Sequence, residues 1–153
     1  MGETLPTRRI GRSIVALLAG FVVVVILSVG TDALLRATGL FPPLGQSPLG
    51  QPMSDALFLL ATAYRIVYAI VGSYITARFA PYRPMQHALV GGLIGLVLSI
   101  VGAVATWNKT ALGPHWYPLA LVVTALPCAW VGGKLRVMQF ATSAGGQNSE
   151  KPV

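Results

Sequence analysis

Between Ile14 and Leu27 the chain reads IVALLAGFVVVVIL, a run without a single charged side chain. With its flanks, this apolar segment covers residues 13–37. It is longer than the roughly 20 residues that cross the hydrocarbon core of a bilayer. Backbone polar groups in lipid must be satisfied within the segment, so we expect a helix despite the β-branched valines.

Three further apolar segments of similar length follow the first. Prolines and glycines separate them and favour loops or tight turns between helices. Each segment again has the length of a membrane span. The sequence therefore predicts an all-α, membrane-spanning bundle of about four helices within residues 13–137, at residues 13–37, 54–79, 85–107 and 116–137.

The overall composition agrees with a membrane protein. Of the 153 residues, 54% are hydrophobic and only 10% are charged, whereas soluble domains carry about 25% charged residues. The net charge of +7 comes from basic residues at the ends of apolar runs, not from one polar face. We therefore expect the lipid bilayer as the partner, and no nucleic acid.

Basic residues also predict the orientation, because they accumulate on the cytoplasmic side of membrane helices. One side of the predicted bundle carries far more of them than the other. Both termini are therefore expected in the cytoplasm, with residues 1–12 as a basic N-terminal segment and residues 138–153 as a flexible tail. The richer side has Arg8, Arg9, Arg12, Arg78, Arg83, Lys134, Arg136 and Lys151, and the other has Arg36 and Lys109.

The N-terminal region also allows a different interpretation. A basic stretch, an apolar run and small residues at Ser28 and Gly30 are features of a cleaved signal peptide. The apolar run is longer than the hydrophobic region of most such peptides. Cleavage would leave three helices with the same orientation.

Arg65 is the most informative charged residue, since it lies inside the second apolar segment. About 11 residues from the helix start, it would be roughly 16 Å deep, near the middle of the membrane. A lone charge at that depth is costly and normally has a partner. Asp32 in the first segment is the expected partner, and we predict a network of Asp32, Arg36, Asp55 and Arg65.

Two readings of this charge network remain open. It could lock the first helix to the second and fix their register. It could instead bind an ion, a proton or an anionic substrate, because intramembrane charges often mark such pathways.

Small residues recur at four-residue spacing along the third segment. Such a stripe allows another helix to approach closely. It could serve packing within the bundle or form a homodimer face. Its members are Gly91, Gly95, Ser99 and Ala103.

Pro127 interrupts the fourth segment. A proline inside a helix removes one hydrogen bond and clashes with the preceding turn, so a kink is expected. The kink could be static, or it could act as a hinge or expose a carbonyl oxygen.

The residues that usually carry chemistry are scarce. Cys128 is the single cysteine, and His87 and His115 are predicted on opposite sides of the membrane. No combination matches a metal site, a nucleophile with its base, or a phosphate or dinucleotide loop. We expect no cofactor, no metal and no catalytic residue, with a membrane-embedded enzyme as a remote alternative.

The arrangement resembles short four-helix inner-membrane proteins of bacteria whose activity is not known. The resemblance covers residues 13–137 and includes the segments Gly30-Thr31-Asp32, Gly72-Ser73-Tyr74 and GPHWYP at residues 113–118. It implies the bacterial inner membrane and carries no activity. The helix count is also similar to that of small multidrug resistance transporters, but those use a glutamate in the first helix, where this chain has Asp32.

These observations leave two main hypotheses for function. The first is a structural or accessory membrane component that contacts copies of itself or another membrane protein. The second is a subunit of a small oligomeric transporter or channel, with Asp32 and Arg65 at its site.

Overall fold

The computed structural model describes residues 5–42, 53–108 and 113–148. These residues form four helices: α1 (Leu5–Ala37), α2 (Asp55–Phe79), α3 (Pro84–Thr106) and α4 (Trp116–Asn148). Each contains a stretch long and apolar enough to cross a membrane. The all-α fold with four membrane-length helices is therefore confirmed.

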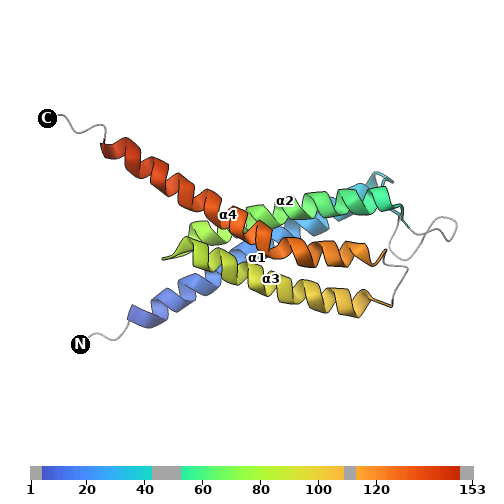
Figure 1. Cartoon of the computed structure of the whole chain (residues 1–153), viewed down its shortest axis with the longest axis horizontal. Helices are drawn as coiled ribbons and strands as arrows, with labels where there is room; N and C mark the ends of the chain where they lie inside the picture. The colour runs from blue at the N-terminus through green and yellow to red at the C-terminus, as the bar shows by residue number, and fades with distance from the viewer. Residues whose placement is uncertain (1–4, 43–52, 109–112, 149–153) are drawn as a thin grey trace.

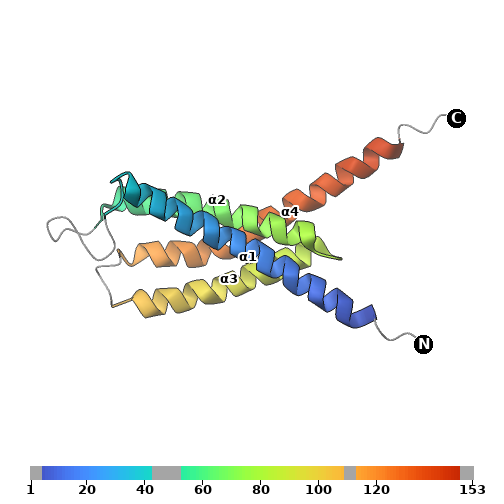
Figure 2. The same cartoon turned by 180° about the vertical axis from the view of Figure 1, so that it is seen from behind.

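The four helices lie alongside one another through the middle of the molecule (Figure 1). The start of α1 and the C-terminal half of α4 leave the bundle at the same end and diverge (Figure 2). We call this the terminal end; the turn between α2 and α3 also lies there. The last residues of α1 and α3 and the first residues of α2 and α4 lie at the opposite end.

Two helices are longer than the sequence indicates. α1 begins at Leu5, within the predicted basic segment of residues 1–12, and Pro6 falls in its first turn, where proline is tolerated. α4 continues to Asn148, so the described part of the predicted tail, residues 138–148, is helical. Contacts beyond Val137 explain part of this extension, because Gln139 bonds to Tyr74 of α2.

The turn between α2 and α3 is set by local backbone chemistry. α2 ends at Phe79, and the backbone N–H of Ala80 donates to the Thr76 carbonyl. Arg83 adopts a left-handed conformation with φ of 46°. Pro84 then begins α3, and its fixed φ suits the first helical position. Four residues are thus enough to reverse the chain.

Small residues form the interior of the bundle. Ala16, Ala88 and Ala129 are 0% exposed. Gly20 and Gly72 bring α1 and α2 so close that a Cβ on Gly72 would overlap the Val24 side chain and the Gly20 carbonyl. Without a hydrophobic force between helices in lipid, such close backbone packing holds the helices together.

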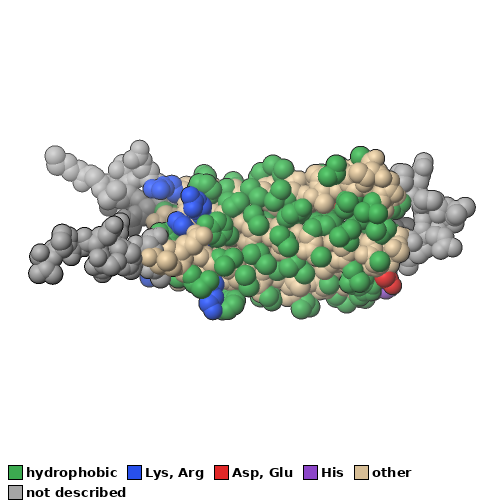
Figure 3. Space-filling view, turned by 90° about the horizontal axis from the view of Figure 1, so that it is seen from above, with side chains coloured by type: hydrophobic (Ala, Val, Ile, Leu, Met, Phe, Trp, Pro, Cys, Tyr) green, Lys and Arg blue, Asp and Glu red, His purple; other side chains and the backbone are tan. Residues whose placement is uncertain are grey.

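Large aliphatic side chains point outward instead. Val104 of α3 and Val123 of α4 are 72% and 71% exposed. Figure 3 shows hydrophobic side chains over the whole visible length of the bundle, with Lys and Arg gathered at one end. An apolar surface of this extent is stable only in a lipid environment. The chain is therefore a multi-pass membrane protein.

Candidate functional site

Asp32 and Arg65 form an ion pair between α1 and α2. Arg65 Nη2 donates to Asp32 Oδ2 at 2.6 Å. The side chains are 25% exposed for Arg65 and 19% for Asp32, so neither is open to solvent on all sides. The two helices run antiparallel, which brings the end of α1 beside the first half of α2.

Tyr64 completes the coordination of the carboxylate. Its hydroxyl donates to Asp32 Oδ1, while Arg65 holds the other oxygen. Both donors come from consecutive residues of α2, which are separated by about 100° around a helix. The carboxylate thus sits between them, with each of its oxygens engaged by a protein donor.

The Arg65 guanidinium also contacts aromatic rings on two helices. Its carbon lies 5.5 Å from the centroid of Tyr64 and 5.6 Å from that of Tyr117 in the first turn of α4. A cation over a ring face is attracted by the ring quadrupole. Through Asp32 and Tyr117, Arg65 therefore links α1, α2 and α4 at one point. We call Asp32, Tyr64, Arg65 and Tyr117 the charge cluster.

A second polar contact joins α1 to α2 beside the charge cluster. The hydroxyls of Thr31 and Tyr68 lie 2.7 Å apart, and the Tyr68 ring packs 5.6 Å from the Tyr64 ring. Thr31 precedes Asp32, and Tyr68 follows Tyr64 by one helical turn. Two adjacent residues of α1 are therefore held by one face of α2.

The charge cluster lies nearer the opposite end than the position of Arg65 in its helix suggests. Asp32 is five residues, or about 8 Å, from the end of α1, and Tyr117 is the second residue of α4. The Arg65 side chain extends its charge toward them and away from the helix midpoint. Long cationic side chains reduce their desolvation in this way.

Two members of the predicted four-residue network lie apart from the pair. In the described residues, the ion pair of Arg65 and Asp32 does not extend to Arg36 or Asp55, and the four-member network stays a prediction. Arg36 is half-buried, and its Nε has no hydrogen-bond partner. Asp55 is exposed at the start of α2 and accepts a bond from Trp116 Nε1 at 3.4 Å, where the helix dipole favours a negative charge.

The predicted stripe on α3 divides between different surroundings. A Cβ on Gly91 would contact Leu17 and Thr76, and one on Gly95 would meet nothing within 4 Å. Ser99 and Ala103 face a pocket beside α4. The close contact with α4 uses Gly92, which packs against Ala129. The stripe is therefore not one continuous packing face.

Pro127 lies inside α4, and the helix changes direction along its length (Figure 1). A kink is expected at this residue because proline removes one helical hydrogen bond and its ring clashes with the preceding turn. Thr124, the nearby hydroxyl, donates to the carbonyls of Ala120 and Leu121 at 2.7 and 3.4 Å. It does not serve the Val123 carbonyl that the proline leaves without a donor.

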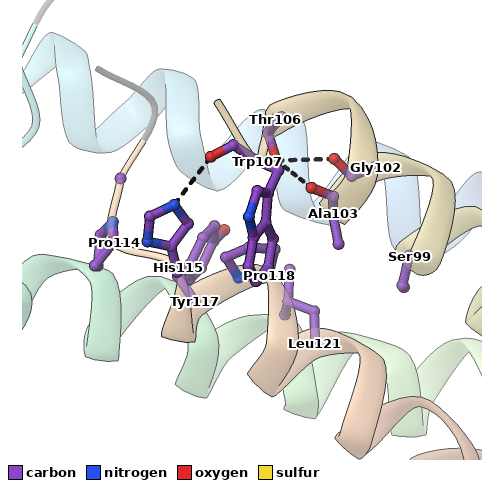
Figure 4. A pocket seen from close by; sticks show the side chains of 11 residues that line it. Ser99, Gly102, Ala103, Thr106, Trp107, Pro114, His115, Tyr117, Pro118 and Leu121 are labelled. Carbon is purple, nitrogen blue, oxygen red and sulfur yellow. Dashed lines mark hydrogen bonds between the residues drawn. The ribbon is translucent and has the colours of Figure 1, made fainter. Parts of the chain in front are cut away.

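A pocket of about 210 Å³ opens between the C-terminal end of α3 and the N-terminal end of α4. Figure 4 shows Trp107 and His115 beside each other, with Tyr117 and Leu121 on the α4 side. The His115 ring donates through Nε2 to the Trp107 carbonyl at 2.9 Å, and the two rings lie 4.7 Å apart. Tyr117 belongs both to this pocket and to the charge cluster.

The parts that sequence reasoning missed are the two tyrosines of the cluster. Tyr64 is next to Arg65, and Tyr117 lies in the stretch GPHWYP at residues 113–118. Tyr64 could have been found as a donor adjacent to the buried charge. Tyr117 could not, because the contact depends on how α4 packs against α2.

Over the described residues, no three His, Cys, Asp or Glu side chains group as metal ligands would. Comparison with protein-family models, curated proteins and solved structures gives no match. The resemblance to four-helix membrane proteins thus stays at the level of architecture.

Proposed function

We propose that this chain is a structural or accessory component of the bacterial inner membrane, with both termini in the cytoplasm. The observation that carries the proposal is that the charged groups of the cluster are bound by other groups of the same protein. Both Asp32 oxygens are bound within the protein, and Arg65 lies against Asp32 and two rings. The most strongly polar group in the spans is used to join three helices.

An accessory protein acts through contacts with other proteins, and the C-terminal half of α3 offers a face for such contacts. Gly95 and Gly102 have open space where a Cβ would be, and Leu98 lies between them, 49% exposed. Small residues at this spacing let a second helix approach closely. The occupant of this face would be a second copy of the chain or another membrane protein.

Photo-crosslinking in native membranes tests the proposal. A benzophenone amino acid in place of Leu98 should give a discrete protein adduct. The matched control replaces Val104, which is 72% exposed on the other side of the same helix, and should give lipid adducts only. An adduct at twice the chain mass means a homo-oligomer, and another mass means a partner. Lipid adducts alone at both positions would contradict the accessory role.

The second candidate is a subunit of a small transporter or channel. The observation in its favour is the shared Tyr117, which places the pocket between α3 and α4 next to Arg65. Flux of protons, sodium or chloride into proteoliposomes distinguishes the two. The accessory role predicts the leak of protein-free liposomes, whereas a flux abolished in Asp32→Asn would establish transport.

A further inference from the structure

Two arginines at the terminal end have no carboxylate partner among the described residues. Arg78 lies in the last turn of α2, and Arg136 lies on α4. The acidic residues in the described part are Asp32, which pairs with Arg65, and Asp55, which lies at the opposite end. The positive charge of the two arginines is therefore not neutralised by these residues.

Tyr74 and Gln139 fix the geometry between the arginines. The Tyr74 hydroxyl donates to Gln139 Oε1 at 2.7 Å, and Arg136 Nη1 donates to the same oxygen at 3.4 Å. Arg78 follows Tyr74 by one helical turn, which places both side chains on the same face of α2. The Tyr74–Gln139 contact between α2 and α4 therefore holds the Arg136 guanidinium, and Arg78 lies one turn away along α2.

The Arg136 guanidinium is also oriented by a ring. Its carbon lies 4.0 Å from the centroid of Phe140. A guanidinium over a ring keeps its N–H donors directed outward in its own plane, where they match two oxygens of a phosphate. Arg78 is exposed and can approach the same anion from α2.

The apolar helix surfaces beside the two arginines favour a lipid phosphate over a free one, because they can contact acyl chains. Val71 of α2 and Leu135 of α4 are 37% and 41% exposed, so the arginines lie at the end of apolar helix surfaces. Lys and Arg side chains gather at one end of the molecule (Figure 3). Basic pockets between membrane helices at the cytoplasmic side suit anionic headgroups.

We propose that Arg78 and Arg136, positioned by the Tyr74–Gln139 bond, bind the phosphate group of an anionic phospholipid in the leaflet at the terminal end. Arg78 and Arg136 supply the charge, and the Tyr74–Gln139 bond holds α2 and α4 at the spacing that the phosphate bridges. The site is independent of the charge cluster, so it stands whether or not the accessory role does.

Native mass spectrometry of the full chain in detergent tests the site. Phosphatidylglycerol and phosphatidylcholine with the same acyl chains are added in separate titrations. The wild type should bind phosphatidylglycerol in preference. In the double variant Arg78→Gln with Arg136→Gln, the affinity for phosphatidylglycerol should fall about tenfold or more, because each basic side chain near a lipid surface contributes measurably.

The matched control is Arg12→Gln with Lys134→Gln, which removes the same charge from exposed positions. It should keep the preference. An equal loss in this control, or no preference in the wild type, would overturn the proposal. So would millimolar inorganic phosphate that displaces the lipid, because the site would then be one for free anions.

If the glutamine variant does not fold, Arg78→Lys with Arg136→Lys replaces it. This variant keeps the charge but loses the planar fork of donors. Weaker binding of phosphatidylglycerol than in the wild type supports the site. Unchanged binding overturns it, since charge alone would then be sufficient.

Discussion

At the scale of single residues, a carboxylate in lipid is stabilised by one cation and one hydroxyl. Removing either partner of a buried ion pair leaves a charge that nothing compensates. The sequence allowed Asp32 and Arg65 to be paired, because few other groups could neutralise Arg65. Tyr64, adjacent to Arg65, could also have been assigned as a donor. Tyr117 could not, because its contact depends on the position of α4.

The substitution Tyr64→Phe should lower the free energy of unfolding by about 1 to 2 kcal/mol, because one Asp32 oxygen loses its donor. Chemical denaturation in detergent measures this change. Tyr82→Phe is the control, since Tyr82 is exposed in the turn before α3 and should have almost no effect. Equal effects of the two substitutions would contradict the role given to Tyr64.

At the scale of helices, backbone proximity holds the elements together. Gly20 and Gly72 form the seam between α1 and α2, and Gly92 meets Ala129 between α3 and α4. The sequence indicated small residues on α3, but it did not tell which of them pack within the bundle: Gly91 and Gly92 do, and Gly95 faces open space. In a lipid-exposed helix both the packed and the outward side are apolar, so the pattern alone does not tell them apart.

The substitution Gly72→Ala should lower the free energy of unfolding by about 1 to 3 kcal/mol, because the added methyl overlaps Val24 and the Gly20 backbone. The matched control is Gly95→Ala, where the methyl meets open space. It should be neutral or slightly stabilising, since alanine favours a helix over glycine. Chemical denaturation of the two variants side by side measures both free energies of unfolding. Similar losses of stability in the two variants would contradict the close packing assigned to Gly20 and Gly72.

At the scale of the whole molecule, the pattern of burial is that of a membrane protein: small residues inside, large aliphatic ones outside. Hydropathy and length were enough to predict four spans, because each helix must satisfy its own backbone in lipid. The helical extensions at both ends were not predictable from hydropathy, since they lie beyond the apolar runs.

The basic residues of the terminal end predict its orientation toward the cytoplasm. In a chain with Cys128→Ala, we expect Thr38→Cys to react with an impermeant maleimide in intact cells. Thr38 is exposed at the opposite end, after α1. Gln86→Cys, exposed at the start of α3, should react only after lysis. Labelling of Gln86→Cys in intact cells and of Thr38→Cys only after lysis would mean that both termini lie outside the cytoplasm.

The role of the charge cluster is tested most directly by the unfolding stability, in detergent, of Asp32→Leu, Arg65→Leu and the double variant. Each single change should cost about 3 to 5 kcal/mol, because it strands one charge. If the pair locks the helices, the double variant should remain about 2 kcal/mol less stable than the wild type, since Tyr64 and Tyr117 lose their partners. A double variant as stable as the wild type would contradict the structural lock and indicate that the pair is kept for a function.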